Sequence, residues 1–393
     1  MTHDISPTTP ATTPATMSAE ASATTELVPT LGRDDYCSPE IFEIERQRIF
    51  HRGWMYAGHI SSVPAGARRV VDIAGESVIV TRTRDGDLHA FANVCRHRGS
   101  QLCDAASSGG HDQLDTGSIQ CPYHAWTYSL DGRLMSTPRV DRAEIDRDQY
   151  GLWEYRVDDW NGLVFVSLDA AAPPLDEWLG AHGDGIDQFV DVPFGDLSLV
   201  ARTSAEVAAN WKILIENYEE CLHCPVVHPE LVERIPLYQT GAVLDPDRDD
   251  WGVELAGRAI GLSLAPEDGL PRLPGISEED ARLYRGAAVF PNLLVDVVGN
   301  GAVLTTLLPH GPDRTSIVAE YLFAPGVTAD SGHDAQSTID FNELVAAQDN
   351  AVCEAVQRGV ASISFTEGVL TAKDSLVADF DVHYVRARGA LER

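Results

Sequence analysis

The chain has 393 residues, 44% of them hydrophobic, so it is long enough for two domains with sizeable cores. Its 29 Lys and Arg against 60 Asp and Glu give a net charge of −31, and such an acidic surface repels phosphate backbones, which argues against nucleic acid as a partner. The sequence contains no apolar run long enough to span a membrane and no apolar signal segment, so its seven cysteines favour a reducing cytoplasm.

The first 30 residues are rich in Thr, Pro, Ala and Ser and offer few large apolar side chains to bury, which predicts a disordered tail over 1–30. Order is expected to begin near Tyr36. Ser38-Pro39-Glu40 is typical of a helix start, because Ser caps the helix and Pro fits its first turn. We therefore expect residues 31–53 to form an N-terminal helix that packs on the second, catalytic domain.

Residues 54–168 have the pattern of an all-β domain. Short β-branched or apolar runs alternate with glycine-containing turns, and Asp131-Gly132 marks a hairpin. The expected strands are 69–73, 77–81, 88–91 and 163–168.

Two loops of this domain each combine a cysteine with a histidine. The first is Cys95-Arg-His97 and the second is Cys121-Pro-Tyr-His124, with 23 residues between the two pairs. Two thiolates and two imidazoles are the ligand set of a Rieske-type 2Fe–2S centre, in which cysteines hold one iron and histidines the other. Imidazole in place of thiolate raises the potential of the cluster and suits it to pass single electrons.

A structural zinc site is the alternative for these loops, since two cysteines and two histidines also suit tetrahedral zinc. Zinc fingers usually pair like with like, whereas each loop here mixes the two residue types. Cys103 and His111, which lie between the pairs, are interpreted as loop residues because both ligand pairs are already complete.

Residues 169–393 have a mixed pattern that predicts a second domain of strands and helices. Long strands are expected at 288–298, 302–308 and 316–323, followed by a helix at about 339–356.

A second pair of histidines, His223 and His228, lies in this domain with Pro225 between them and Pro229 after them. Residues five apart diverge on a regular helix, but proline ends or distorts the helix here, so both imidazoles can reach one metal. A zinc site that includes Cys221 and Cys224 is the alternative. We interpret those two cysteines as buried packing residues.

Both motifs closely resemble those of the Rieske non-haem iron oxygenases, also called ring-hydroxylating oxygenase α subunits. The resemblance rests on Asn93–Gly99, Cys121–Tyr128 and Asn210–Pro229, and it covers both domains but not the tail. The third segment is most similar to the choline, carnitine, glycine betaine and stachydrine monooxygenases. The linker between the first two departs from the family by being several residues longer.

The resemblance implies an α+β fold, with an all-β Rieske domain followed by a catalytic domain of the helix-grip type. It implies a Rieske 2Fe–2S cluster and a mononuclear Fe(II) held by two histidines and a distant carboxylate, which leaves open positions for dioxygen and substrate. Asp349, on the expected C-terminal helix, is the candidate carboxylate, and Asp340 and Glu354 are its rivals.

Glu220 matches the acidic residue that, in the family, bridges an iron-ligating histidine and a cluster histidine of the neighbouring subunit. The resemblance therefore implies a ring of subunits, usually a homotrimer, in which electrons cross an interface. Glu219 is the local competitor, but it lies four residues before His223 instead of three.

These features predict a terminal oxygenase component that uses O2 and electrons from NAD(P)H to hydroxylate or oxidatively demethylate a small organic substrate. A separate reductase, with flavin and an iron–sulfur centre, is the expected electron source. Quaternary ammonium compounds are candidate substrates because aromatic faces can hold their cations. The candidate aromatic residues, which are also compatible with a simple core, are Tyr218, Tyr238, Trp251 and Tyr284.

Two other functions stay open at this point. Apolar stretches at 253–264 and 302–308 are compatible with a pocket for an arene and hence with an aromatic cis-dihydroxylating dioxygenase. A Rieske electron-transfer protein without oxygenase activity is the alternative of another class, although it leaves His223, His228 and Glu220 without a role.

Overall fold

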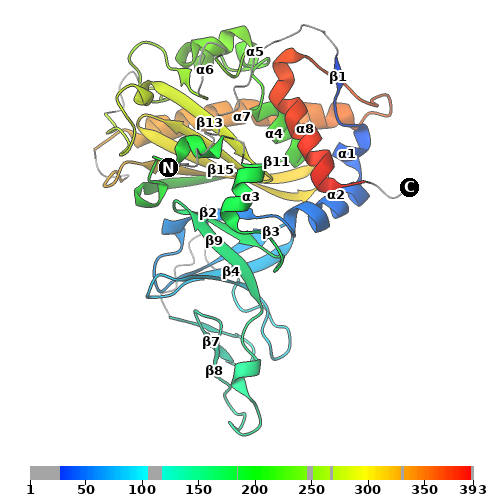
Figure 1. Ribbon diagram of the computed structural model, residues 1–393, viewed down its shortest axis with the longest axis vertical. Helices are drawn as coiled ribbons and strands as arrows, with labels where there is room; N and C mark the ends of the chain where they lie inside the picture. The colour runs from blue at the N-terminus through cyan, green and yellow to red at the C-terminus, as the bar shows by residue number, and fades with distance from the viewer. Residues whose placement is uncertain are drawn as a thin grey trace, which may run out of the picture.

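The computed structural model describes residues 27–104, 117–183, 185–245, 251–265, 269–328 and 332–390. Figure 1 shows a large body of strands and helices at one end of the long axis and a smaller all-β body at the other. The expected α+β class, with an all-β domain beside a catalytic domain of antiparallel strands and helices, is confirmed. Among the described residues, none of the helices combines the length and hydrophobicity needed to cross a bilayer.

The smaller body contains a six-stranded antiparallel sheet in the order β2-β10-β9-β5-β4-β3 and a three-stranded sheet, β6-β7-β8. Strands β7 and β8 lie at the far tip of the molecule in Figure 1. The four strands expected from the sequence are present, and Asp131-Gly132 forms the turn between β7 and β8, as predicted. The strands are β2 Met55–His59, β3 Arg68–Ile73, β4 Glu76–Arg82, β5 Leu88–Ala92, β6 Ser118–Gln120, β7 Thr127–Ser129, β8 Leu134–Ser136, β9 Glu154–Trp160 and β10 Leu163–Ser167.

The larger body is built on a second antiparallel sheet, in the order β11-β16-β15-β14-β13-β12. Its strands are β11 Ser198–Val207, β12 Val253–Glu254, β13 Leu283–Val289, β14 Leu293–Val298, β15 Gly301–Gly311 and β16 Arg314–Phe323. The helices are α1 Arg33–Cys37, α2 Pro39–Glu45, α3 Leu175–His182, α4 Trp211–Tyr218, α5 Cys224–Val227, α6 Pro229–Arg234, α7 Ala335–Val360 and α8 Ser375–Arg388.

Two of the expected elements in this body differ from the structure. The single strand expected at 288–298 is wrong, because β13 and β14 form a hairpin that Val289 and Leu293 close as a pair. Pro291 lies in its turn, and proline has no N–H to donate to a strand ladder. The helix expected at about 339–356 is longer, since α7 begins four residues earlier, where the side chain of Asp334 accepts a hydrogen bond from the N–H of Ser337.

The N-terminal segment packs against the helices of the larger body. Helix α2 begins where it was predicted, and the Ser38 hydroxyl accepts a hydrogen bond from the N–H of Ile41 at 3.3 Å. Val28–Pro29 form strand β1, which pairs with β17, Val369–Leu370, so the disorder expected through residue 30 does not reach these residues. The rest of the expected tail, residues 1–26, lies outside the described residues.

A buried carboxylate joins three of the helices. Glu45, at the end of α2, accepts hydrogen bonds from Lys212 Nζ at 2.6 Å, from Tyr384 Oη at 2.7 Å and from Trp211 Nε1 at 2.9 Å. Glu45 and Lys212 are both 0% exposed. Because the partners come from α4 and α8, this network fixes the start of α4 relative to both ends of the chain.

Replacing Lys212 with Met tests the network. Removing one partner leaves a buried charge uncompensated, so Lys212→Met should destabilise the protein by about 3–5 kcal/mol. The double variant Glu45→Leu/Lys212→Met should regain much of this loss, because no lone charge remains. Urea unfolding followed by fluorescence checks both expectations, and a single variant as stable as the parent contradicts the account.

Candidate metal centres

The first candidate centre lies between the loops that follow β5 and β6. The thiols of Cys95 and Cys121 belong to a buried cluster, whereas His97 is exposed and His124 is partly so. The two imidazole rings lie 4.6 Å apart, and the indole of Trp126 stacks on His97 at 4.7 Å. The loops therefore place both thiols inside and both imidazoles toward solvent.

The two thiols occupy different electrostatic surroundings. Burial raises the pKa of Cys95, despite a contact of 3.4 Å between its sulfur and Tyr128 Oη. Burial also acts on Cys121, but hydrogen bonds from the backbone N–H groups of Tyr123 and His124 outweigh it, so the pKa of this thiol is lowered. Backbone donors aimed at a sulfur stabilise its thiolate, the form that ligates iron.

The donor set fits a two-iron cluster better than one zinc ion. His124 Nδ1 is buried without a hydrogen-bond partner in the described structure, as expected for a nitrogen that ligates a metal. A tetrahedral zinc needs its ligand atoms to converge on one point. Within the described ranges, the one group of three or more ligands that converges in this way is in the other centre.

The second candidate centre brings His223, His228 and Asp349 together. Their ligand atoms all lie within 4.8 Å of one another. Asp349 Oδ1 lies 2.8 Å from His228 Nε2 and 3.3 Å from His223 Nε2. His223 precedes the short helix α5, His228 lies between α5 and α6, and Pro225 and Pro229 open those helices. The interrupted helix predicted from the sequence thus turns both imidazoles toward α7.

Each imidazole is also held at its other nitrogen. His228 Nδ1 lies 2.7 Å from Gln348 Oε1, and His223 Nδ1 lies 2.5 Å from Glu220 Oε1. Such partners fix the ring so that Nε2 is presented to a metal. Burial lowers the pKa of His223, but hydrogen bonds to Asp349 and Glu220 outweigh it and raise the pKa to about 9. Negative charge therefore gathers at a point suited to a cation.

The rival residues lie elsewhere. Glu219 lines a neighbouring cavity, Asp340 accepts a hydrogen bond from Gln336, and Glu354 accepts one from the N–H of Ala208. The geometry therefore favours Asp349 and Glu220 over them.

Cys221 and Cys224 are buried, as expected, but they are not simple packing residues because a disulfide joins them. Their Cα atoms are only 5.0 Å apart in the turn around His223, which suits a disulfide. Sulfurs bonded to each other are not thiolate ligands, so the zinc alternative does not fit this form of the protein.

A cavity of about 290 Å³, here called the iron chamber, is lined in part by His223, His228 and Asp349. Alternate residues of one sheet face line it, as the two-residue period of a strand requires. Leu294 and Asp296 of β14 are among them. Asp296 Oδ1 accepts hydrogen bonds from Tyr284 Oη at 2.5 Å and from Tyr218 Oη at 2.9 Å.

Burial raises the pKa of Asp296 to about 6, although the two hydroxyls act in the opposite direction. Gly286, its cross-strand neighbour on β13, gives those hydroxyls room. A Cβ at this position would lie 2.7 Å from Tyr218 Oη and 2.8 Å from Tyr284 Oη. Asp296 was not predicted from the sequence. The one sequence feature that points to it is that it is the single acid on a strand face whose neighbouring positions are Leu294 and Val298.

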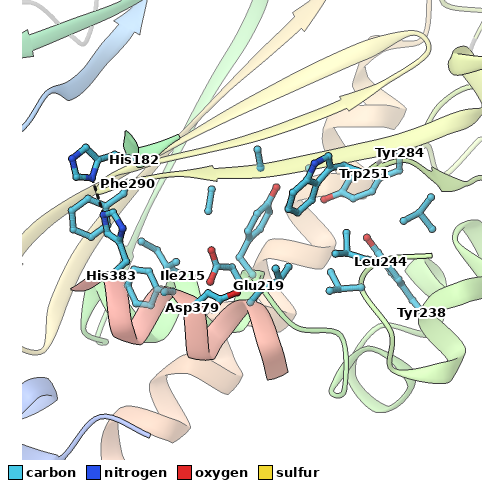
Figure 2. Close-up of a pocket in the computed structure, with 18 residues that line it drawn as sticks. His182, Ile215, Glu219, Tyr238, Leu244, Trp251, Tyr284, Phe290, Asp379 and His383 are labelled. Carbon is cyan, nitrogen blue, oxygen red and sulfur yellow. Dashed lines mark hydrogen bonds between the residues drawn. The ribbon is translucent and has the colours of Figure 1, made fainter. Parts of the chain in front are cut away.

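A second cavity of about 160 Å³, here called the outer cavity, shares Tyr218, Tyr238 and Tyr284 with the iron chamber. Figure 2 shows Tyr238, Trp251 and Tyr284 on one side of it and His182, Phe290 and His383 on the other, with Glu219 and Asp379 between them. His182 Nδ1 and His383 Nε2 lie 2.8 Å apart. All four aromatic residues proposed from the sequence line this cavity, and three of them also line the iron chamber.

Two protein families match the chain. The Rieske [2Fe-2S] domain matches residues 53–155, and the ring hydroxylating alpha subunit (catalytic domain) matches residues 194–389. Together the two matches cover both candidate centres.

Curated relatives cover most of the chain. The oxygenase subunit of glycine betaine monooxygenase from Chromohalobacter salexigens is 29% identical over 85% of this chain and 80% of its own length. The oxygenase subunit of carnitine monooxygenase from Acinetobacter baumannii is 26% identical, over 83% of this chain and 84% of its own. Choline monooxygenase of Beta vulgaris is 27% identical, over 85% and 71% respectively.

Solved structures share the fold. A quaternary ammonium Rieske monooxygenase in complex with γ-butyrobetaine superposes with a TM-score of 0.71 and 23% identity, covering 92% of this chain and 96% of that one. Naphthalene 1,2-dioxygenase from Rhodococcus superposes with a TM-score of 0.62 and 23% identity, covering 86% and 83%.

The buried charge of Asp296 should cost stability at neutral pH. Its pKa of about 6 in the folded protein exceeds that of an unfolded aspartate, about 3.9, so stability falls as pH rises between the two values. Asp296→Asn should therefore stabilise the protein by about 2–3 kcal/mol at pH 8, with little gain below pH 4. Urea unfolding at both pH values measures the difference between variant and parent.

Asp340→Asn is the matched control, because Asp340 is an exposed aspartate on α7. It should change stability by less than about 0.5 kcal/mol at either pH. If Asp296→Asn changes the free energy of unfolding equally at pH 4 and pH 8, burial of the Asp296 charge does not destabilise the protein as stated.

Proposed function

The chain belongs to the Rieske non-haem iron oxygenases, and from this premise we propose that it is a terminal oxygenase component that oxidises a small quaternary ammonium compound. The observation that carries the proposal is the convergence of His223, His228 and Asp349 in the wall of a cavity that tyrosines also line. A pure electron-transfer protein needs neither the three ligands nor the cavity.

We assign the cluster to Cys95, His97, Cys121 and His124, and the mononuclear Fe(II) to the three convergent residues. When bound, these groups supply single-electron transfer and the activation of dioxygen. The protein's own residues do the positioning. Glu220 holds His223 by its Nδ1, and Gln348 holds His228 in the same way.

The assembly we propose is a homotrimer in the cytoplasm, served by a reductase that carries flavin and an iron–sulfur centre and takes electrons from NAD(P)H. The exposed imidazole of His97 is available to a neighbouring subunit, and Glu220 is the acidic residue it would meet. A solved quaternary ammonium Rieske monooxygenase that oxidises carnitine is described as showing inter-subunit electron transfer.

The proposed reaction is monooxygenation. One atom of O2 enters the substrate as a hydroxyl group, two electrons and two protons convert the other to water, and hydroxylation of an N-methyl group ends in loss of that methyl as formaldehyde. The names of the glycine betaine, carnitine and choline relatives support this substrate class. A screen with a surrogate reductase tests it, following oxygen uptake and product mass. If the screen instead yields a cis-diol from an arene and no turnover of methylammonium compounds, the proposed monooxygenation is wrong and the reaction is aromatic dihydroxylation.

The isolated protein should be red-brown and contain about three irons per chain, two in the cluster and one on the histidines. His223→Ala should keep the visible spectrum, contain about two irons and lose turnover, because one ligand of the mononuclear site is gone. Iron analysis and absorption spectroscopy measure both. His310→Ala, an exposed histidine on β15, is the control and should keep all three irons. A colourless protein with stoichiometric zinc would contradict the assignment.

Glu220→Gln should keep both metals and a reducible cluster, yet slow substrate oxidation by at least about tenfold, because a charged hydrogen bond is replaced by a neutral one. Stopped-flow reduction and steady-state turnover separate the two effects. Glu233→Gln, an exposed glutamate on α6, should leave turnover unchanged. Near-parental turnover of Glu220→Gln would remove Glu220 from the mechanism.

A further inference from the structure

Apart from the two histidines of the iron site, the described lining of the iron chamber contains acids and no basic side chain. Apart from the three ligands and Glu220, the charged residues among its described lining are Asp296 and Glu343, and that lining includes no Lys or Arg. Glu343 accepts hydrogen bonds from Tyr321 Oη at 2.6 Å and Thr203 Oγ1 at 2.7 Å. Away from the iron site, the charged side chains of the described wall are therefore all acidic.

Asp296 is the less exposed of these two acids, because Glu343 on α7 is exposed and Asp296 is partly buried. It projects from the middle of β14, and the donors that hold Oδ1 are two neutral tyrosine hydroxyls. Neutral donors orient a carboxylate but leave its charge in place. A buried charge is costly unless an opposite charge meets it, and the cavity beside Asp296 is where such a partner can enter.

The aromatic residues around Asp296 suit a cation of low hydration. Tyr218, Tyr238 and Tyr284 all line the chamber, and the rings of the last two lie 6.2 Å apart at 81°. Tyrosine faces attract methylated ammonium groups through the ring quadrupole. The outer cavity continues this character with Glu219, Asp379 and Trp251, and its described lining also contains no Lys or Arg (Figure 2).

A zwitterion would have a harder fit than a simple cation. Glycine betaine and carnitine carry a carboxylate besides the ammonium group, whereas choline carries a hydroxyl. In a cavity of about 290 Å³, the carboxylate of such a substrate must lie within a few ångströms of the wall acids. Like charges repel at that distance, and the low polarity of the cavity strengthens the repulsion. The described lining offers this carboxylate no guanidinium or ammonium partner.

We therefore propose that the iron chamber selects a methylated ammonium alcohol or amine of net positive charge over carboxylate-bearing betaines, and that Asp296 sets this preference. This inference rests on the proposed function and narrows its substrate class. Tyr218, Tyr284 and Gly286 are positioning residues in this scheme, because they act by holding the Asp296 carboxylate toward the cavity.

Three matched probes test the preference without any turnover. Calorimetric titration of the unreduced, iron-loaded protein would compare choline, glycine betaine and 3,3-dimethylbutan-1-ol, the neutral carbon analogue of choline. Choline should bind at least about tenfold more tightly than either of the others, since one desolvated ion pair is worth that factor or more. Equal or tighter binding of glycine betaine would overturn the proposal, as would equal binding of the neutral analogue.

The role of Asp296 needs one variant and its control. Asp296→Asn, checked for full iron content, should weaken the binding of choline by at least about tenfold. Its affinity for the neutral analogue should stay within about twofold of the parent's. Asp340→Asn should change neither. Unaltered choline affinity in Asp296→Asn would remove Asp296 from the proposal, and if this variant does not fold, the three probes on the parent protein still decide the charge preference.

Failure of this inference is distinguishable from failure of the proposed function. Turnover of betaines in preference to choline overturns the inference and leaves the monooxygenase assignment intact. Oxidation of arenes alone, with no binding of any methylammonium probe, overturns both.

Discussion

The contact between helix α7 and the chain after α4 is the constraint on which the rest of the catalytic body depends. Two neighbouring residues of α7 form hydrogen bonds with the two ring nitrogens of His228: Asp349 with Nε2 and Gln348 with Nδ1. His228 is almost fully buried, so these bonds form away from competing water. Because His228 and Asp349 are 121 residues apart in the sequence, their contact fixes the position of α7 relative to the chain after α4. Residues of α7 and of the sheet strands then line the iron chamber together.

Helix α4 connects the buried core to both sides of the chamber. Its first turn is held by the network around Glu45, which reaches Lys212 and Trp211. Two turns later, Tyr218 reaches Asp296 on the sheet, and the chain then breaks to present Glu220 and His223. One short helix therefore sets both the substrate wall and the metal side of the site. A shift at its buried start would move both together.

The sequence predicted best what is local. Each Cys and His pair proposed for the cluster lies within one loop, and His223 and His228 lie within one broken helix, so local spacing was enough to select them as candidates. Asp349 had rivals in the sequence, since a helix carboxylate far along the chain has no local signature, and only the packing of α7 brings it to His228. It remains the proposed third ligand. The disulfide between Cys221 and Cys224 was missed because two buried free cysteines and two disulfide-bonded cysteines look the same in a sequence. The β13–β14 hairpin was missed because its apolar character continues through the turn.

Asp296 shows why some functional residues escape any local rule. Its role depends on Tyr218 of α4, which is 78 residues away in the sequence, and on two residues of the neighbouring strand β13, Tyr284 and Gly286. The pairing of β13 with β14, which the sequence analysis did not predict, brings the last two beside it. An asparagine at this position would accept the same two hydrogen bonds without the cost of burying a charge. The tyrosines therefore do not require a carboxylate. What a carboxylate adds is negative charge beside a cavity whose described lining, apart from the two histidines of the iron site, contains acids and no Lys or Arg. A cation that enters this cavity is the group that would make use of that charge.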